Sequence, residues 1–439
     1  MTKIKIFYFL TVTISLLFFS NKVYSSTVSL IAGTAKINIT PINDMPIHDS
    51  LYARVLILEM ENEKLAFVSV DQGIFTNDRL GKICKEKYGI SRLFLSSSHT
   101  HSSGTNVSDF VTNQIIKAVG QANKETFSAR ISAGTRSFPQ LGFNRLIVRE
   151  DGHSRESWFS DDHYTSENPE RIPFGPVDPE VGVIKIEDLN GKSRAIIMNY
   201  ACHADVVCQN YEISADFPGV ACHKVEEAFG KEMTCLFMQG AAGDIESLII
   251  SSRRNGATDA FKTDYRTIDR VGGLLASETI KLAMSLKPTE QKETDIKSMD
   301  DSLKFTGRFS KSESFNIHIS TILINNNIVI ATCPGEPFVR LQLDWKKKIK
   351  EAGSIPFLFG YTWYEGTWPN YIADIQSAAR GGYGADQNSP VLIQVGAGES
   401  IMDKHLENYF RLNGLMRNES GPVGFKSGSQ WVITELKGK

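Results

Sequence analysis

The sequence predicts an α/β fold built as a single large mixed-sheet domain with long loops. Three observations lead to this fold class. Short runs rich in β-branched residues alternate along the chain with stretches of helical periodicity. No internal repeat, low-complexity tract or Pro/Ser-rich linker divides the 439 residues. About 410 residues remain if an N-terminal leader is removed, which is enough to bury a substantial core.

The individual elements follow from these patterns. We predict strands over 54–58, 65–70, 93–97, 181–186, 194–198 and 236–238, and helices over 110–122, 218–229 and 267–285. Residues 315–324 and 328–332 flank three consecutive asparagines, which indicates a hairpin within the same domain. The region 142–178 has no clear periodicity, and we interpret it as a lid or a loop that lines a site.

The N-terminus has the features of a secretory signal peptide. Lys3 and Lys5 precede an apolar run over 6–19, and the small residues Ser25 and Ser26 follow. A short membrane anchor is the alternative, but the run is shorter than the roughly 20 residues of a spanning helix. We therefore expect residues 1–25 to be removed and residues 26–439 to form the mature domain, exported to the periplasm or beyond the cell.

Charge and cysteine content narrow the function classes. The formal net charge of −2 provides no basic field, which argues against nucleic acid as a partner. The six cysteines form no CxxC pair, so a cysteine zinc site is not expected. An oxidising compartment permits disulfides, and Cys202 and Cys208 are close enough for a local bridge. The alternative interpretation, that these cysteines are buried free thiols, fits the sequence equally well.

Two histidines follow an apolar strand in the segment Ser98-His99-Thr100-His101-Ser102. Ligand sites in open α/β sheets lie at the carboxyl ends of strands. In an extended segment His99 and His101 point the same way, so one can bind a metal while the other faces substrate. Solvent-facing turn histidines are the alternative.

A third histidine, His203, has the same setting after the strand at 195–200. Asp205 and Asp216 lie nearby in sequence, and their carboxylates could orient a ligand imidazole. A structural histidine is the alternative here, but two histidine sites with one pattern favour a metal site.

Three further segments are candidates for the same site. The turn from Gln239 to Asp244 lacks the Gly-Lys-Ser/Thr ending of a phosphate loop, so we expect it to bring backbone amides or Asp244 close to a site. Glu336 lies on a turn between Pro334 and Pro337 and becomes a metal ligand only if it meets the histidines in space. An aromatic segment over 360–384 is typical of cleft linings.

Taken in order, these residues resemble the neutral (alkaline, non-lysosomal) ceramidases, zinc amidases that hydrolyse the N-acyl bond of ceramide. The resemblance runs from residue 32 to about Tyr383. It is carried by Tyr52-Ala53-Arg54, Ser69-Val70-Asp71, His99-Thr100-His101, Asn144-Arg145, Cys202-His203, Gln239 to Asp244, and Pro334-Gly335-Glu336.

The resemblance implies that residues 26–439 form a ceramidase-like zinc hydrolase domain, and it implies a site and a mechanism. One Zn²⁺ would be held by His99, His203, Glu336 and Tyr371. The residues around the scissile amide would be His101, which moves a proton to the leaving amine, and Arg145 or Tyr383, which donate to the oxyanion. The implied substrate is ceramide or another amphiphile, with transient membrane-surface contact and no obligate protein partner.

Two departures bear on the substrate. Glu246 stands where the family has a serine that has been proposed as catalytic, and Ser247 is one position late. The chain also ends too soon after Tyr383 for the family's C-terminal immunoglobulin-like domain. The leading hypothesis is therefore a zinc amidase for an N-acylated lipid. The alternatives are a zinc hydrolase for a non-lipid amide or ester, and a non-catalytic binding protein on the same scaffold.

Overall fold

The structure is a computed structural model, and it describes ten segments of the chain. These are residues 29–42, 45–104, 108–138, 141–156, 172–208, 212–248, 265–288, 294–363, 365–387 and 389–416. The predicted signal peptide lies outside the described residues. All of the predicted site residues lie within them.

A large mixed sheet forms one half of the molecule. Its strand order is β11-β10-β9-β5-β1-β2-β3-β4-β18, with β3–β4 and β10–β11 parallel and the other pairs antiparallel. The strands are β1 (Ile31–Asn38), β2 (Tyr52–Met60), β3 (Glu63–Val70), β4 (Arg92–Ser97), β5 (Thr126–Ser137), β9 (Glu180–Asp188), β10 (Ser193–Tyr200), β11 (Thr234–Gln239) and β18 (Thr362–Trp363). The predicted α/β fold with a large mixed sheet is confirmed.

A second, four-stranded sheet packs face to face against the first. It has the order β13-β14-β15-β17, with bounds Ile296–Thr306, Ser314–Ile324, Ile328–Thr332 and Ile355–Phe359. Leu58 and Phe67 from the large sheet share one buried cluster with Ile330 and Phe357 from the small one. The predicted hairpin is confirmed as the antiparallel pair β14–β15.

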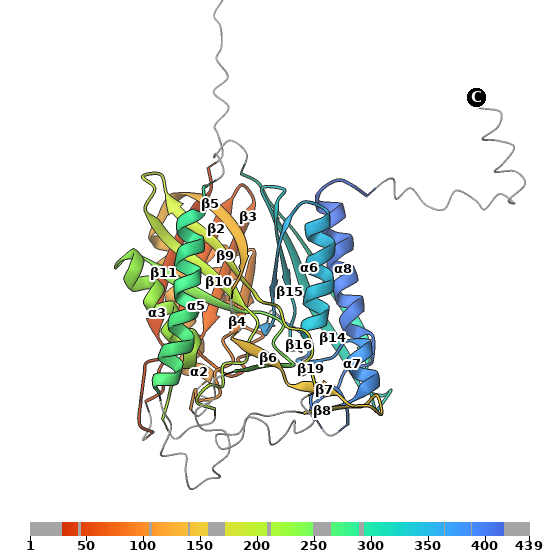
Figure 1. The fold of residues 1–439 in the computed structure, drawn as a ribbon. Coiled ribbons are helices and arrows are strands. Elements are labelled where there is room, and N and C mark those ends of the chain that lie inside the picture. Colours follow the sequence, from red (N-terminus) through yellow and green to blue (C-terminus); the bar gives the residue numbers. More distant parts are fainter. Residues whose placement is uncertain are drawn as a thin grey trace, which may run out of the picture.

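Helices cover the outer face of each sheet, so that the molecule has four layers (Figure 1). The large sheet carries α1 (Leu80–Tyr88), α2 (Ser108–Lys124), α3 (Asp216–Phe229) and α5 (Arg266–Ser285), and the small sheet carries α6 (Val339–Glu351) and α8 (Ala397–Leu412). Each helix buries one apolar face, as Val111, Ile115 and Val119 do on α2. The three predicted helices are confirmed to within two residues at each end.

Short elements gather at one edge of the two sheets, at the bottom of Figure 1. They are the pairs β6–β12 (Gly142–Asn144 with Ile245–Ser247), β7–β8 (Leu146–Val148 with Ser154–Glu156) and β16–β19 (Glu336–Pro337 with Tyr371–Ile372), and helix α7 (Ile375–Arg380). The region interpreted as a loop therefore contains three short strands, and its middle, 157–171, lies outside the described residues.

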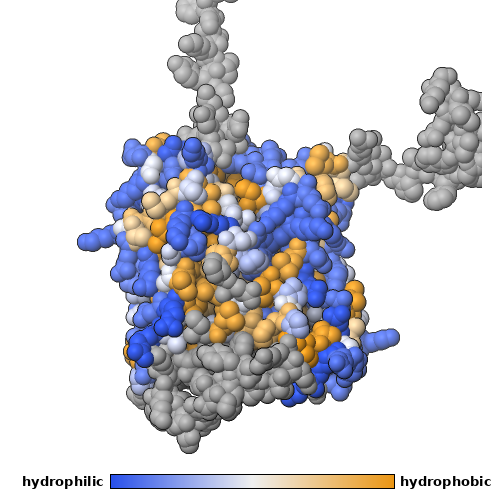
Figure 2. Space-filling model, in the orientation of Figure 1, coloured by the Kyte–Doolittle hydropathy of each residue, from blue (hydrophilic) through white to orange (hydrophobic). Residues whose placement is uncertain are grey.

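Part of the molecular surface is apolar. Hydrophobic residues gather in the middle of the face drawn in Figure 2, between α5 and α6. Leu274 and Met284 of α5 are 49% and 74% exposed. No described helix has both the length and the hydropathy needed to cross a membrane.

All six cysteines are free thiols, so the structure has no Cys202–Cys208 bridge.

Candidate metal centre

The carboxyl ends of strands from both sheets meet at one place. His99 follows β4, His203 follows β10, and Glu336 lies a few residues after β15. Their exposed fractions are 6%, 0% and 4%. Gly360, directly after β17 of the small sheet, links the two sheets here, because its amide donates to the carbonyl of Gln239 of the large sheet at 2.8 Å. The geometry therefore brings two imidazoles and a carboxylate from distant parts of the chain into one buried site.

Backbone carbonyls hold His99 in place. Its amide donates to the carbonyl of Gln72 at 2.9 Å, and its Nδ1 lies 2.8 Å from the carbonyl oxygen of Gly73. A carbonyl only accepts, so Nδ1 carries the proton and Nε2 presents its lone pair. The backbone of His99 has φ 66°, in the left-handed region. The extended alternation expected for this segment is therefore broken at His99 itself.

His203 is oriented in the same manner. Its Nδ1 lies 2.6 Å from the carbonyl oxygen of Ala242 and 3.1 Å from that of Ile245. The expectation that Asp216 orients this ring is wrong, because its two carboxylate oxygens accept from the amides of Val207 and Phe217. Burial lowers the pKa of His203, which favours the neutral ring that a metal requires.

The glycine-rich turn at 240–243 contacts the site through its carbonyls, whereas the sequence predicted that backbone amides or Asp244 would lie close to it. Besides the carbonyl of Ala242, that of Gly243 accepts from Nη2 of Arg145 at 2.5 Å. Asp244 contacts the site indirectly, since its carboxylate accepts from Asn144 at 2.6 Å and from the amide of Val339 at 2.8 Å. Burial raises the pKa of Asp244 to about 6. The turn thus supports both His203 and Arg145.

Glu336 completes the group. Its Oε2 lies 3.4 Å from Nε2 of His99 and 3.5 Å from Nε2 of His203. Burial alone would raise the pKa of Glu336, but protonated His99 and His203 rings, through their charge and hydrogen bonds, outweigh it and hold that pKa well below its usual range. The carboxylate is therefore anionic, and it faces the two ring nitrogens instead of solvent.

His101 borders the same space. Its Nε2 lies 3.3 Å from Nε2 of His99, and the two rings meet edge to face at a centroid distance of 4.8 Å. Burial, together with His99 and His203, holds the pKa of His101 well below its usual range. It is the most exposed of the three histidines, which fits a group that meets substrate.

These donors fit a metal ion. One ring nitrogen from each of His99, His101 and His203 lies within 4.8 Å of the others. The buried Nε2 of His203 makes no hydrogen bond among the described residues. Two ligand atoms bound to a tetrahedral zinc at about 2.0–2.1 Å lie roughly 3.3 Å apart, close to the separations from Glu336 to the two rings. A metal ion would occupy the place between the carboxylate and the ring nitrogens that protons on the rings fill in its absence.

The structure places two tyrosines beside Glu336. Tyr371 is its direct partner in the parallel pair β16–β19, and burial raises the pKa of Tyr371. Tyr361 was not singled out from the sequence. Its hydroxyl donates to Oε2 of Glu336 at 3.4 Å, and its ring centroid is 4.6 Å from that of His99. Its position two residues after β17 repeats the strand-end pattern of the histidines, which could have identified it.

Arg145 and Tyr383 both lie beside the ring of Tyr371. The Arg145 guanidinium stacks on the rings of Tyr383 and Tyr371, at 4.8 and 5.5 Å from their centroids. Its Nη1 lies 3.3 Å from Oε2 of Glu246, and both side chains are buried. Burial would lower the pKa of Arg145, but Tyr371 and Glu246 outweigh it and raise that pKa. Glu246, at the expected serine position, is therefore the counter-ion of Arg145.

One cavity in the described part of the chain lies away from this site. Its volume is about 670 Å³, and its lining includes Lys36, Arg194, Glu226 and Thr234. Arg194 and Thr234 lie at the amino ends of β10 and β11, whereas His203 follows the carboxyl end of β10. This cavity carries none of the predicted site residues.

Comparisons with known proteins give a clear likeness of fold. A crystal structure of neutral ceramidase from Pseudomonas aeruginosa matches with a TM-score of 0.66 and 15% identity, over 91% of this chain and 77% of that one. A structure described as ceramidase complexed with C2 matches with a TM-score of 0.67 over the same shares, also at 15% identity. No family model and no curated protein matches the sequence. The chain thus has a neutral ceramidase-like fold.

Proposed function

We propose that this chain is a zinc-dependent hydrolase that cleaves the N-acyl amide bond of ceramide or a related N-acylated lipid. The observation that carries the proposal is the convergence of His99, His203 and Glu336, with each ring turned by a backbone carbonyl so that Nε2 faces the carboxylate. The ceramidase-like fold supports the same reading.

The proposed roles follow from the geometry. His99, His203, Glu336 and Tyr371 would hold the zinc ion. When bound there, zinc would lower the pKa of a water from about 15.7 toward about 7 and polarise the scissile carbonyl. His101 is partly exposed beside this group, and its ring would accept a proton and pass it to the leaving amine.

Arg145 and Tyr383 are proposed to stabilise the oxyanion and to shape the pocket wall. The direct hydrogen bond to the oxyanion would come from the guanidinium of Arg145, which donates to Glu246 and Gly243, or from the hydroxyl of Tyr383. Such a donor contributes roughly 3–4 kcal/mol in acyl-transfer enzymes. We further propose export of the chain and transient contact with a membrane surface, from the predicted signal peptide and the class of substrate.

A second candidate function keeps the zinc centre and changes the substrate. The buried Glu246–Arg145 pair favours it, because a charged pair beside the reacting bond suits a polar amide or ester better than a lipid. Acyl-chain length discriminates the two. A lipid amidase should lose about fourfold in kcat/KM per methylene removed, at ~0.8 kcal/mol per buried CH₂, whereas a polar-substrate hydrolase should show little dependence.

The test combines metal analysis with turnover of a panel of N-acyl substrates of graded chain length. We expect one zinc per chain, and loss of both zinc and activity in His99→Ala and His203→Ala. His223→Ala is the matched control, because His223 lies on α3 with its side chain 65% exposed. If the purified protein holds no zinc, or if both variants keep full activity, the proposed function is wrong.

A further inference from the structure

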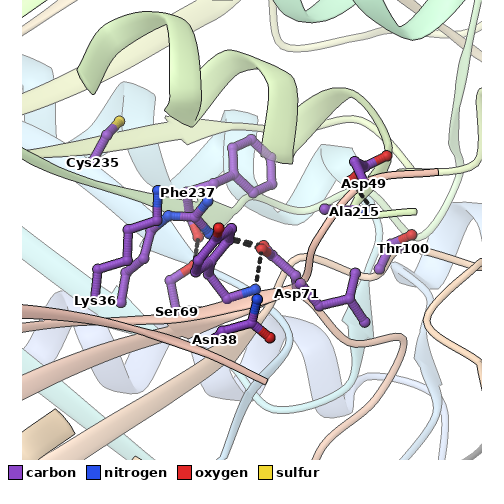
Figure 3. A network of polar contacts seen from close by, with 12 residues as sticks. Lys36, Asn38, Asp49, Ser69, Asp71, Thr100, Ala215, Cys235 and Phe237 are labelled. Carbon is purple, nitrogen blue, oxygen red and sulfur yellow. Dashed lines mark hydrogen bonds and ion pairs between the residues drawn. The ribbon is translucent and has the colours of Figure 1, made fainter. Parts of the chain in front are cut away.

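Two buried charged residues lie near the metal centre without contacting it. Arg54 is in β2 and Asp71 directly follows β3, and each is only 1% exposed. Nη1 of Arg54 donates to both carboxylate oxygens of Asp71, at 2.8 and 3.1 Å. Figure 3 shows Asp71 within this network of polar contacts.

The network extends away from the centre to the surface. Oε1 of Glu226 lies 3.5 Å from Nε of Arg54, and Oε2 of Glu226 accepts from Nζ of Lys36 at 2.6 Å. Arg54 is thus held between a carboxylate on each side, and the four charges balance. This arrangement fixes the guanidinium, which in turn fixes Asp71.

Asp71 is also clamped to the backbone. Its Oδ2 accepts from the amide of Tyr52 at 2.8 Å, and its own amide donates to the carbonyl of Tyr52 at 3.0 Å. The two residues that follow are the ones that hold the metal ligand. The carbonyl of Gln72 accepts from the amide of His99, and the carbonyl of Gly73 faces its Nδ1.

We propose that the Arg54–Asp71 ion pair is the positioning device for His99. It holds the backbone of residues 71–73 so that two successive carbonyls set the backbone and the ring orientation of His99. This inference rests on the proposed metal centre. It adds two positioning residues, Arg54 and Asp71, whose described contacts include none of the proposed metal ligands.

The tight fit around residue 73 explains why a small displacement matters. A Cβ at Gly73 would lie 3.3 Å from the carbonyl oxygen of Thr100, so this segment is pressed against the chain just after His99. If the ion pair were lost, residues 71–73 could not relax without moving the carbonyl that faces Nδ1. The tilt of the His99 ring would change with it.

The test uses the double variant Arg54→Met/Asp71→Asn in the full chain. Both charges are removed together, because a single change would leave an uncompensated buried charge and endanger folding. Zinc affinity is measured by competition with a chromophoric chelator. We expect it to fall about tenfold, the lower end of the effect of outer partners of metal ligands. Arg54→Lys/Asp71→Glu, which restores both charges, should recover part of this loss.

A matched control separates positioning from general destabilisation. Glu187 of β9 is a buried carboxylate that pairs with Arg130 at 2.8 Å and Lys185 at 3.2 Å. It pairs in register with Ser193 at the amino end of β10, the end opposite His203. Glu187→Gln should lower the midpoint of thermal unfolding without changing zinc affinity. Equal loss of zinc affinity in this control would overturn the proposal.

A second readout needs no metal. In the zinc-free protein, the Nδ1 proton of His99 should give a hydrogen-bonded NMR resonance, assigned by its loss in His99→Ala. We expect this resonance to shift or broaden in Arg54→Met/Asp71→Asn and to stay unchanged in Glu187→Gln. If both the resonance and the zinc affinity are unchanged in the folded double variant, the ion pair does not position His99. Absence of zinc from the wild type would instead refute the proposed function.

Discussion

Glu246 and Arg145 form a buried ion pair in which each residue depends on the other. Their charged atoms lie 3.3 Å apart, and their side chains are 0% and 2% exposed. Removing one partner of such a pair leaves an uncompensated charge, at a cost of roughly 3–5 kcal/mol. Any variant at position 246 therefore changes both the stability of the fold and the freedom of Arg145.

Glu246→Ser should raise turnover of ceramide, because it frees Nη1 of Arg145 toward the reacting carbonyl. It should also lower the free energy of unfolding by roughly 3 kcal/mol. Both effects are measurable, as kcat/KM on ceramide and as urea unfolding. Glu246→Gln keeps the shape of the side chain and serves as the control. An unchanged ceramide rate in a folded Glu246→Ser variant would remove this position from the account of specificity.

The ring orientations of His99 and His203 could not be predicted from the sequence, although the residues themselves could. The sequence brought His99, His203 and Glu336 forward as side chains at strand ends, and the structure places them together. The groups that orient the two rings are carbonyls of Gly73 and Ala242. Every residue has a carbonyl, so residue type carries no signal for these contacts. Only the fold can reveal them.

At the scale of elements, α8 is attached to the small sheet through His405. Its Nδ1 accepts from Thr321 of β14 at 2.8 Å, and its Nε2 donates to the carbonyl of Thr332 of β15 at 3.0 Å. Burial lowers the pKa of His405 to about 4. The folded state therefore holds this ring neutral at a pH where the unfolded chain would already protonate it.

This shift predicts an acid dependence of stability. The pKa is depressed on folding, so the stabilisation is complete above the unfolded value of about 6.5 and is lost as the pH falls toward 4. The loss is about 3 kcal/mol, at 1.36 kcal/mol per pKa unit. Urea unfolding at pH 7 and pH 4 should show a smaller difference for His405→Gln than for the wild type. Equal differences would contradict the assignment.

Elements were predictable where burial imposes a regular pattern. β3 and β11 are buried along nearly their whole length, and their apolar runs were evident. β13 is not, because most of Ile296–Thr306 is exposed or half-buried and its residues include Lys297, Asp300 and Asp301. Its place in the second sheet comes from pairing with β14. Pairing between distant strands cannot be read from local composition.

At the scale of the whole molecule, the proposed metal ligands belong to different layers. His99 and His203 extend from the large sheet, whereas Glu336 follows β15 of the small one. A metal ion held by all three would therefore link the two sheets at the edge where the short strands gather. Its binding energy would add to the stability of the packed pair.

Removal of zinc should therefore loosen both sheets at once. At a free zinc concentration of 100 times the Kd, bound metal adds about 2.7 kcal/mol. We expect chelation to lower the midpoint of thermal unfolding and to increase hydrogen exchange just after β4, β10 and β15. The same experiment on His99→Ala should show no response to the chelator. A chelated wild type with unchanged exchange at these three strand ends would show that no such link exists.

Three residues at the metal centre have a strained backbone conformation. His99, Tyr361 and Asn370, whose carbonyl accepts from the amide of Glu336 at 2.8 Å, all adopt left-handed φ angles, of 66°, 53° and 55°. For residues with a side chain this conformation costs on the order of 1 kcal/mol or more, and glycine would remove the cost. His99 and Tyr361 are only 6% and 1% exposed, so replacing either with glycine would lose more packing than it would relieve in backbone strain. The same side chains that build the site therefore hold its backbone in the strained conformation, and the strain persists as long as the site does.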